Sequence, residues 1–199
     1  MTWQEFMALL VLATAMSFSP GPNTTLSTAL AANGGLPRAM RFVLAVPIGW
    51  TVLLALCTAG IGALVVAVPA LRWVIKALGI AYLLWLAFKL SGSATLGKAG
   101  DAAVRVGFVQ GVMLQFLNIK AWLLALTLVA GWIAGHADAL QRFAIVASVM
   151  LVYAFASNFT YALVGALLRG WLATGRRLLW FNRAMAAVLV LTAAWMVKV

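Results

Sequence analysis

The chain contains 199 residues, of which 66% are hydrophobic and only 9% are charged. A soluble domain carries about 25% charged residues, so this composition excludes an ordinary soluble globular protein. Apolar runs of about 20 residues, the length that crosses a bilayer as a helix, recur along the whole chain. We therefore predict an all-α membrane protein that forms a single domain over residues 1–199.

Basic residues outnumber acidic ones by 14 to 3, which gives a formal net charge of +11. In a soluble protein this excess would suggest a nucleic-acid partner. Here the basic residues lie mostly in short loops between apolar runs, where they orient membrane helices. We therefore expect membrane lipids as neighbours and no nucleic-acid partner.

Six membrane-spanning segments are predicted, and in chain order they cover residues 5–29, 39–68, 70–90, 106–134, 140–168 and 179–198. The loops after the first, third and fifth segments hold most of the basic residues: Arg38, Arg41, Lys89, Lys98, Arg105, Arg169, Arg176, Arg177 and Arg183. The positive-inside rule places these loops in the cytoplasm and both termini outside the cell (inner) membrane.

The first segment is interrupted by Ser19-Pro20-Gly21-Pro22, which cannot continue a regular helix. The prolines release upstream carbonyls, which lipid does not tolerate unless they line a wet cavity. Such carbonyls accept hydrogen bonds from an ammonium group, and the helix that resumes at Asn23 offers N–H groups suited to an anion. The alternative is a proline kink that only shapes packing.

The fourth segment carries Lys120 in an otherwise apolar stretch. A lysine at the centre of a membrane helix costs about 2.5–3.5 kcal/mol on insertion scales. Lys120 is about fourteen residues, or roughly 20 Å, from either end of an unbroken segment, which is too far for it to snorkel to the interface. It offers an ammonium to a carboxylate, and Asn118 beside it can donate and accept. Gln115 either lines the same space or bonds another helix.

Two halves of the chain, residues 1–90 and 106–199, each begin with a segment that is polar at mid-span. Three segments per half is an odd number, so the second half enters the membrane from the opposite side. This is the inverted-repeat plan of many secondary transporters, whose sites lie between the repeats. Ala55, Ala59, Ala63 and Ala67 form a small-residue ladder that serves either helix packing within one subunit or a homodimer.

The three acidic residues, Glu5, Asp101 and Asp138, lie at segment ends or in loops. No carboxylate is therefore predicted to pair with Lys120, which favours a ligand that brings its own, such as an amino acid with a neutral side chain. The sequence has no metal-binding cluster, phosphate-binding glycine loop or Ser/His/Asp set, so we expect neither an enzyme nor a cofactor.

Three motifs resemble the LysE/RhtB family of amino-acid exporters: Ser19-Pro20-Gly21-Pro22-Asn23, then Leu78 to Lys89, then Phe116-Leu117-Asn118-Ile119-Lys120-Ala121. The similarity covers essentially the whole chain. It implies a multi-pass cell-membrane protein that exports amino acids or their derivatives.

One position departs from the family pattern, which usually reads Asn-Pro-Lys where this chain has Asn118-Ile119-Lys120. Without the proline, the fourth segment is either broken like the first or unbroken, with Lys120 as a lone side-chain ligand. The stretch Leu114 to Lys120 resembles the cysteine/O-acetylserine exporter branch, which implies small neutral substrates.

The sequence thus favours a secondary exporter with its site between the first and fourth segments. The alternatives are a non-transporting membrane scaffold or subunit and a small-solute channel. The residues expected to bind the substrate are Lys120, Asn118, Asn23, Ser19, Pro20, Gly21, Pro22 and Gln115.

Overall fold

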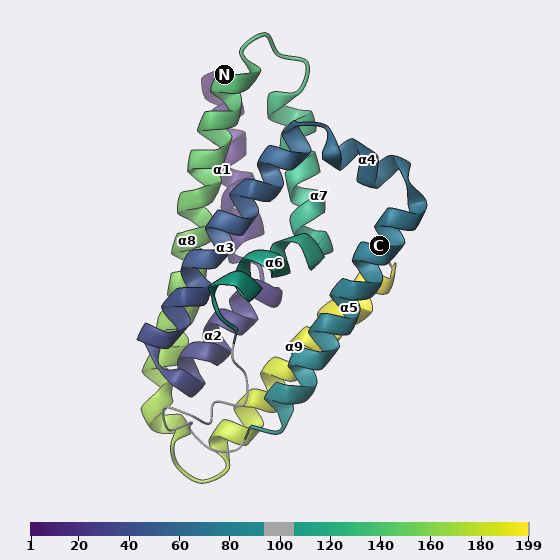
Figure 1. Ribbon diagram of the computed structural model, residues 1–199. Coiled ribbons are helices and arrows are strands. Elements are labelled where there is room, and N and C mark those ends of the chain that lie inside the picture. Colours follow the sequence, from purple (N-terminus) through teal and green to yellow (C-terminus); the bar gives the residue numbers. More distant parts are fainter. Residues whose placement is uncertain (94–105, 199) are drawn as a thin grey trace.

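The computed structural model describes residues 1–93 and 106–198, which are almost entirely helical (Figure 1). The helices are α1 (Trp3–Phe18), α2 (Pro22–Gly34), α3 (Leu36–Thr58), α4 (Ile61–Ala67), α5 (Pro69–Ser91), α6 (Phe108–Leu117), α7 (Ile119–Leu128), the π-helical η1 (Val129–Ile133), α8 (Ala139–Leu172) and α9 (Arg177–Lys198). The expected loop residues Lys98, Asp101 and Arg105 lie outside the described residues.

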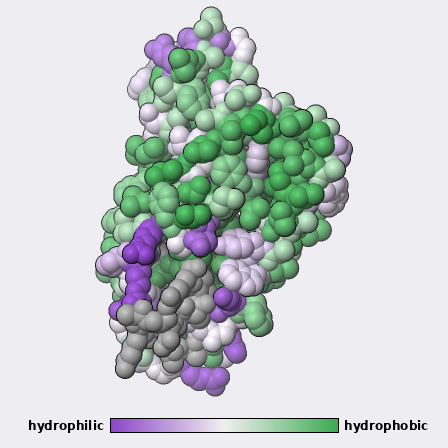
Figure 2. Space-filling view, viewed as in Figure 1, coloured by the Kyte–Doolittle hydropathy of each residue, from purple (hydrophilic) through white to green (hydrophobic). Residues whose placement is uncertain are grey.

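Four of the described helices, α3, α5, α8 and α9, are long and apolar enough to cross a membrane. A fifth span results if α6 and α7–η1 are taken together, and α1 is apolar but shorter. Figure 2 shows hydrophobic residues over the middle of the visible face and hydrophilic residues towards its two ends. The described chain is therefore an all-helical protein with four to five candidate membrane spans.

Neighbouring helices come from distant parts of the sequence. α3 packs on α8 and α6, α2 packs on α8, and α5 pairs with α9 along the side of the molecule (Figure 1). Glycine allows the closest of these approaches, since a methyl group at Gly165 of α8 would overlap the Thr28 backbone of α2. Small residues at helix crossings are the usual means of close packing in membranes.

The predicted second segment, residues 39–68, is not one helix. α3 ends at Thr58, and Gly60 adopts a left-handed conformation with φ of 95° before the short helix α4 begins. Only glycine enters this region readily, and two small residues, Ala59 and Gly60, offer little packing that would keep the helix straight. The ladder from Ala55 to Ala67 is therefore divided between two helices and does not form one continuous packing surface.

The acidic residues of the described chain gather at one end of the molecule, where α1 and α8 begin. Arg142 donates to Asp138 at 2.8 Å and to Glu5 at 3.3 Å. The Arg142 guanidinium holds the pKa of the Asp138 carboxyl, which lies in the turn before α8, below its ordinary value. These ion pairs connect the start of α1 to the start of α8. The carboxylates of Glu5 and Asp138 are therefore paired with Arg142 and do not pair with Lys120.

Candidate functional site

The first helix break, residues 19–21, separates α1 from α2. Pro20 and Pro22 have no N–H, so the carbonyls of Met16 and Phe18 lose their helical donors. The Gly21 N–H is diverted to the Thr24 hydroxyl at 3.0 Å, which also releases the Ser17 carbonyl. The predicted interruption is therefore present.

The Ser19 carbonyl also lacks a helical donor, since the Asn23 N–H does not bond it. Side chains replace the missing donors at three of these four released carbonyls. The Ser19 hydroxyl donates to Met16 O at 2.9 Å, and the Tyr161 hydroxyl of α8 donates to Phe18 O at 2.9 Å. Lys120 donates to Ser19 O at 3.4 Å. Among residues 1–93 and 106–198, no donor bonds the Ser17 carbonyl.

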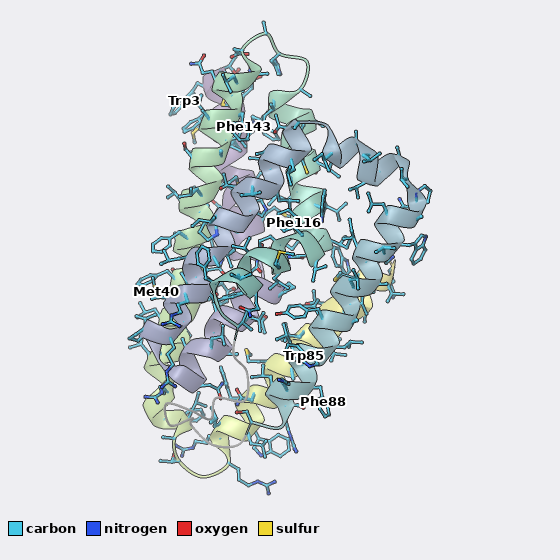
Figure 3. The ribbon with its side chains drawn as sticks, viewed as in Figure 1. Trp3, Met40, Trp85, Phe88, Phe116 and Phe143 are labelled. Atoms are coloured by element: carbon cyan, nitrogen blue, oxygen red, sulfur yellow. The ribbon has the colours of Figure 1, made fainter. Side chains whose placement is uncertain are left out.

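The second break lies at Asn118, between α6 and α7–η1, whose axes differ by 69°. Asn118 is extended (φ −96°, ψ 100°), and its side-chain oxygen accepts the Lys120 N–H at 3.2 Å as an N-cap of α7. The indole of Trp122 donates to the released carbonyl of Phe116 at 2.8 Å, and Phe116 lies at this bend in Figure 3. The fourth segment is therefore broken without a proline.

This break corrects the estimate of where Lys120 lies. The estimate of fourteen residues from either end assumed a straight helix, whereas Lys120 lies in the first turn of α7, directly after the bend. Its ammonium contacts the first break, with Nζ 2.6 Å from the Ser19 hydroxyl oxygen. The lysine thus connects the two interrupted helices, although 101 positions separate it from Ser19.

A cavity lined by both polar and apolar residues, called the chamber below, lies beside this contact and has an empty volume of about 510 Å³, part of it open to the outside. Its lining comes from α1, the first break, α2, α3, the second break, α7 and α8. The polar lining side chains are Ser17, Ser19, Asn23, Thr24, Asn118, Lys120, Ser157 and Asn158, together with the indole of Trp50. No carboxylate is among the described lining residues, so Lys120 is the charged group of the chamber.

Two amide side chains beside the chamber bind each other across the two halves of the chain. The Asn23 amide donates to Gln115 at 2.8 Å and accepts from it at 3.1 Å. Gln115 is fully buried and is not among the lining residues, so it lies behind Asn23 and joins α6 to α2. Of the two roles considered for Gln115, the structure supports the bond to another helix.

The other expected residues divide between the chamber and a second space. Ser19, Gly21, Pro22, Asn23, Asn118 and Lys120 line the chamber. Pro20 instead lines a neighbouring recess against α9, called the apolar recess below, with Met16, Gly21, Lys120, Val188, Leu191, Thr192 and Trp195. The structure thus brings seven of the eight expected residues to one of two adjoining spaces.

Residues of α8 complete the chamber and were not expected from the sequence. Asn158 is 3% exposed and accepts from the Ser27 hydroxyl of α2 at 2.9 Å, and Ser157 lines the wall beside it. The available signal was a polar pair inside a long apolar segment, since such residues face the protein interior or a wet cavity. No interruption of α8 drew attention to them.

Comparison with known proteins identifies the family. A family model described as "LysE type translocator" matches residues 14–198, which include both helix breaks. The chain belongs to the LysE family. This membership confirms the resemblance and describes a translocator rather than an enzyme.

Relatives of this LysE-type chain carry the name "Cysteine/O-acetylserine efflux protein". The protein from Salmonella paratyphi A is 32% identical over 178 residues, which cover 87% of this chain and 88% of the relative. The protein from Escherichia coli (strain K12) is 30% identical over 151 residues, which cover 76% of this chain and 77% of the relative. No solved structure matches this LysE-type chain.

Proposed function

We propose that this LysE-type translocator is a secondary exporter of small, neutral amino acids or their derivatives across the cell (inner) membrane. The family match and the names of the relatives support amino-acid export. The observation that carries the proposal is the position of Lys120, an ammonium between two helix breaks in a chamber whose described lining holds no carboxylate.

In this proposal Lys120 binds the carboxylate of the substrate. Lys120 is partly buried, and a cation without an acidic partner is costly inside a membrane, so a carboxylate ligand would relieve that cost. The ammonium of Lys120 now donates to Ser19, a neutral partner that an anion can replace, because charge-assisted hydrogen bonds are about twice as strong as neutral ones. Asn118 holds the start of α7, and with it Lys120, in place.

The substrate's own ammonium would bind on the opposite side of the chamber. The Ser17 carbonyl has no donor among the described residues, and Asn23, Ser157 and Asn158 supply further side-chain oxygens. Since these groups are neutral, they suit one ammonium group better than the additional cation of a basic side chain. This arrangement favours amino acids with neutral side chains.

We also propose that six segments cross the membrane as two inverted repeats, with α1–α2 and α6–α7–η1 each forming one interrupted span. The packing supports this symmetry, because α1–α2 packs on α8 as α6–α7 packs on α3, and the equivalent helices pair with each other, α3 with α8 and α5 with α9. With the basic loops in the cytoplasm, both termini would face outward.

An efflux screen tests the proposed function. Liposomes that contain the purified protein are loaded with each common amino acid in turn. They should release small neutral amino acids faster than protein-free liposomes do, at rates that saturate and that rise when substrate is present on the opposite side. A scaffold would release none, and a channel would release them without saturation or stimulation. Either result would contradict the proposal.

A further inference from the structure

The apolar recess adjoins the chamber on the far side of Lys120. Apart from Lys120, the polar groups of its described lining are the Thr192 hydroxyl, which donates to the Val188 carbonyl of its own helix, and the indole N–H of Trp195. Its remaining surface comes from Met16, Pro20 and Gly21 and from Val188, Leu191 and Trp195 of α9. The recess therefore offers mainly apolar contacts, with few hydrogen-bonding groups besides the lysine.

Three residues, Met16, Gly21 and Lys120, line both the recess and the chamber. A methyl group at Gly21 would lie 3.6 Å from the Lys120 Nζ, so the absence of a side chain there leaves space directly over the ammonium. The backbone of Gly21 is extended, with φ of −174°, which does not require glycine. Among the described residues, Lys120 is thus the cation at which the two spaces meet.

This division matches the shape of an α-amino acid, in which the carboxylate, ammonium and side chain leave the same carbon in different directions. A substrate with its carboxylate at Lys120 and its ammonium in the chamber directs its side chain away from the chamber's polar groups. The apolar recess is the space that then receives it.

We propose that the apolar recess is the side-chain subsite of the exporter and that it selects aliphatic side chains such as those of valine, leucine and methionine. This inference rests on the proposed function and extends its neutral substrates from small side chains to longer aliphatic ones. Each methylene group buried in an apolar site raises affinity about fourfold. Leucine should therefore bind more tightly than alanine by at least about tenfold.

Substitutions on α9 test the inference, because neighbouring positions point into and away from the recess. Val188→Phe places a larger side chain in the recess, whereas Val190→Phe adds the same volume at an exposed position that does not line it. With protein in liposomes, KM is measured for alanine and for leucine. We expect Val188→Phe to raise the KM for leucine about tenfold with little change for alanine, and Val190→Phe to resemble the wild type.

Leu191→Trp provides a second variant in case Val188→Phe does not fold, because Leu191 is 69% exposed and tolerates a larger side chain. It should lower the preference for leucine in the same direction. The inference would be overturned if the ratio of the two KM values were unchanged in both variants, or if the wild type transported alanine but not leucine. Membrane lipid would then be the occupant of the recess. A wild type that moves no amino acid above the leak would overturn the proposed function as well.

Discussion

At the first helix break two prolines remove backbone donors, whereas at the second every residue from Leu117 to Lys120 retains its N–H. The first break is therefore fixed by covalent structure and persists in any packing arrangement. The second depends on what surrounds it: the Asn118 cap, the Trp122 indole and the close approach of α5. Substitutions that remove these supports of the second break should consequently have larger effects than the matching substitutions near the first.

The largest effect is expected from Gly79→Ala. A methyl group at Gly79 of α5 would overlap the Leu117 carbonyl oxygen at the end of α6, and backbone atoms cannot move aside cheaply. Overpacking of this kind costs about 1–3 kcal/mol or more. Thermal unfolding in detergent should show the loss, while Gly92→Ala, where a methyl group meets nothing within 4 Å, should unfold like the wild type. Equal stabilities would show that α5 does not support the break.

At each break, one released carbonyl accepts a hydrogen bond from an aromatic side chain, and these two donors can be compared directly. Trp122→Phe leaves the Phe116 carbonyl without its donor at a site where the indole is only 6% exposed, and we expect a loss of about 1–3 kcal/mol. Tyr161→Phe removes the donor to Phe18, but this hydrogen bond is exposed, so the loss should stay below about 1 kcal/mol. Unfolding free energies of the two variants check the order, and the reverse order would refute the contrast between the breaks.

Asn118→Ala removes the N-cap of α7. Loss of such a cap costs about 1 kcal/mol, and because the capped turn holds Lys120, transport should fall as well. Thr127→Ala on the same helix removes a hydroxyl that bonds only its own helix and should change neither quantity. Normal transport by Asn118→Ala would show that the cap does not position the lysine.

The smallest effect is expected from Ile119→Pro, which restores the proline usual in the family pattern. Ile119 is the first residue of α7, whose N–H has no partner inside the helix, and Asn118 already has the extended conformation that precedes proline. Stability should change by no more than about 1 kcal/mol, and transport should persist. Leu123→Pro, inside α7, should cost about 3 kcal/mol or more. A collapse of Ile119→Pro comparable to that of Leu123→Pro would contradict the described backbone.

The difference between the breaks also explains what the sequence could predict. The break at residues 19–21 was predictable because proline acts locally, and Lys120 was recognisable because a cation is costly in an apolar segment. The break at Asn118 was not predictable from local chemistry, since an asparagine caps a helix only when packing allows the chain to bend there. The end of α3 at Thr58 was missed for a similar reason, because glycine permits a turn but does not require one.

The site shows the same limit. Asn23, Asn118 and Lys120 were found from their positions at or beside interruptions, whereas Ser157 and Asn158 lie in the unbroken helix α8. Gln115 is polar and lies close in sequence to Asn118, yet its side chain bonds Asn23 and does not line the chamber. Which way a polar side chain faces depends on its neighbours in space, and a single sequence does not contain that information.

The central claim, that Lys120 binds the substrate carboxylate, is tested most directly by efflux from liposomes containing Lys120→Met, with Leu123→Met on the same helix as the control. Loss of a hydrogen bond to a charged group costs about 1.5–3 kcal/mol, so we predict that kcat/KM falls at least about tenfold in Lys120→Met and stays near the wild-type value in Leu123→Met. Undiminished efflux by a folded Lys120→Met protein would contradict it.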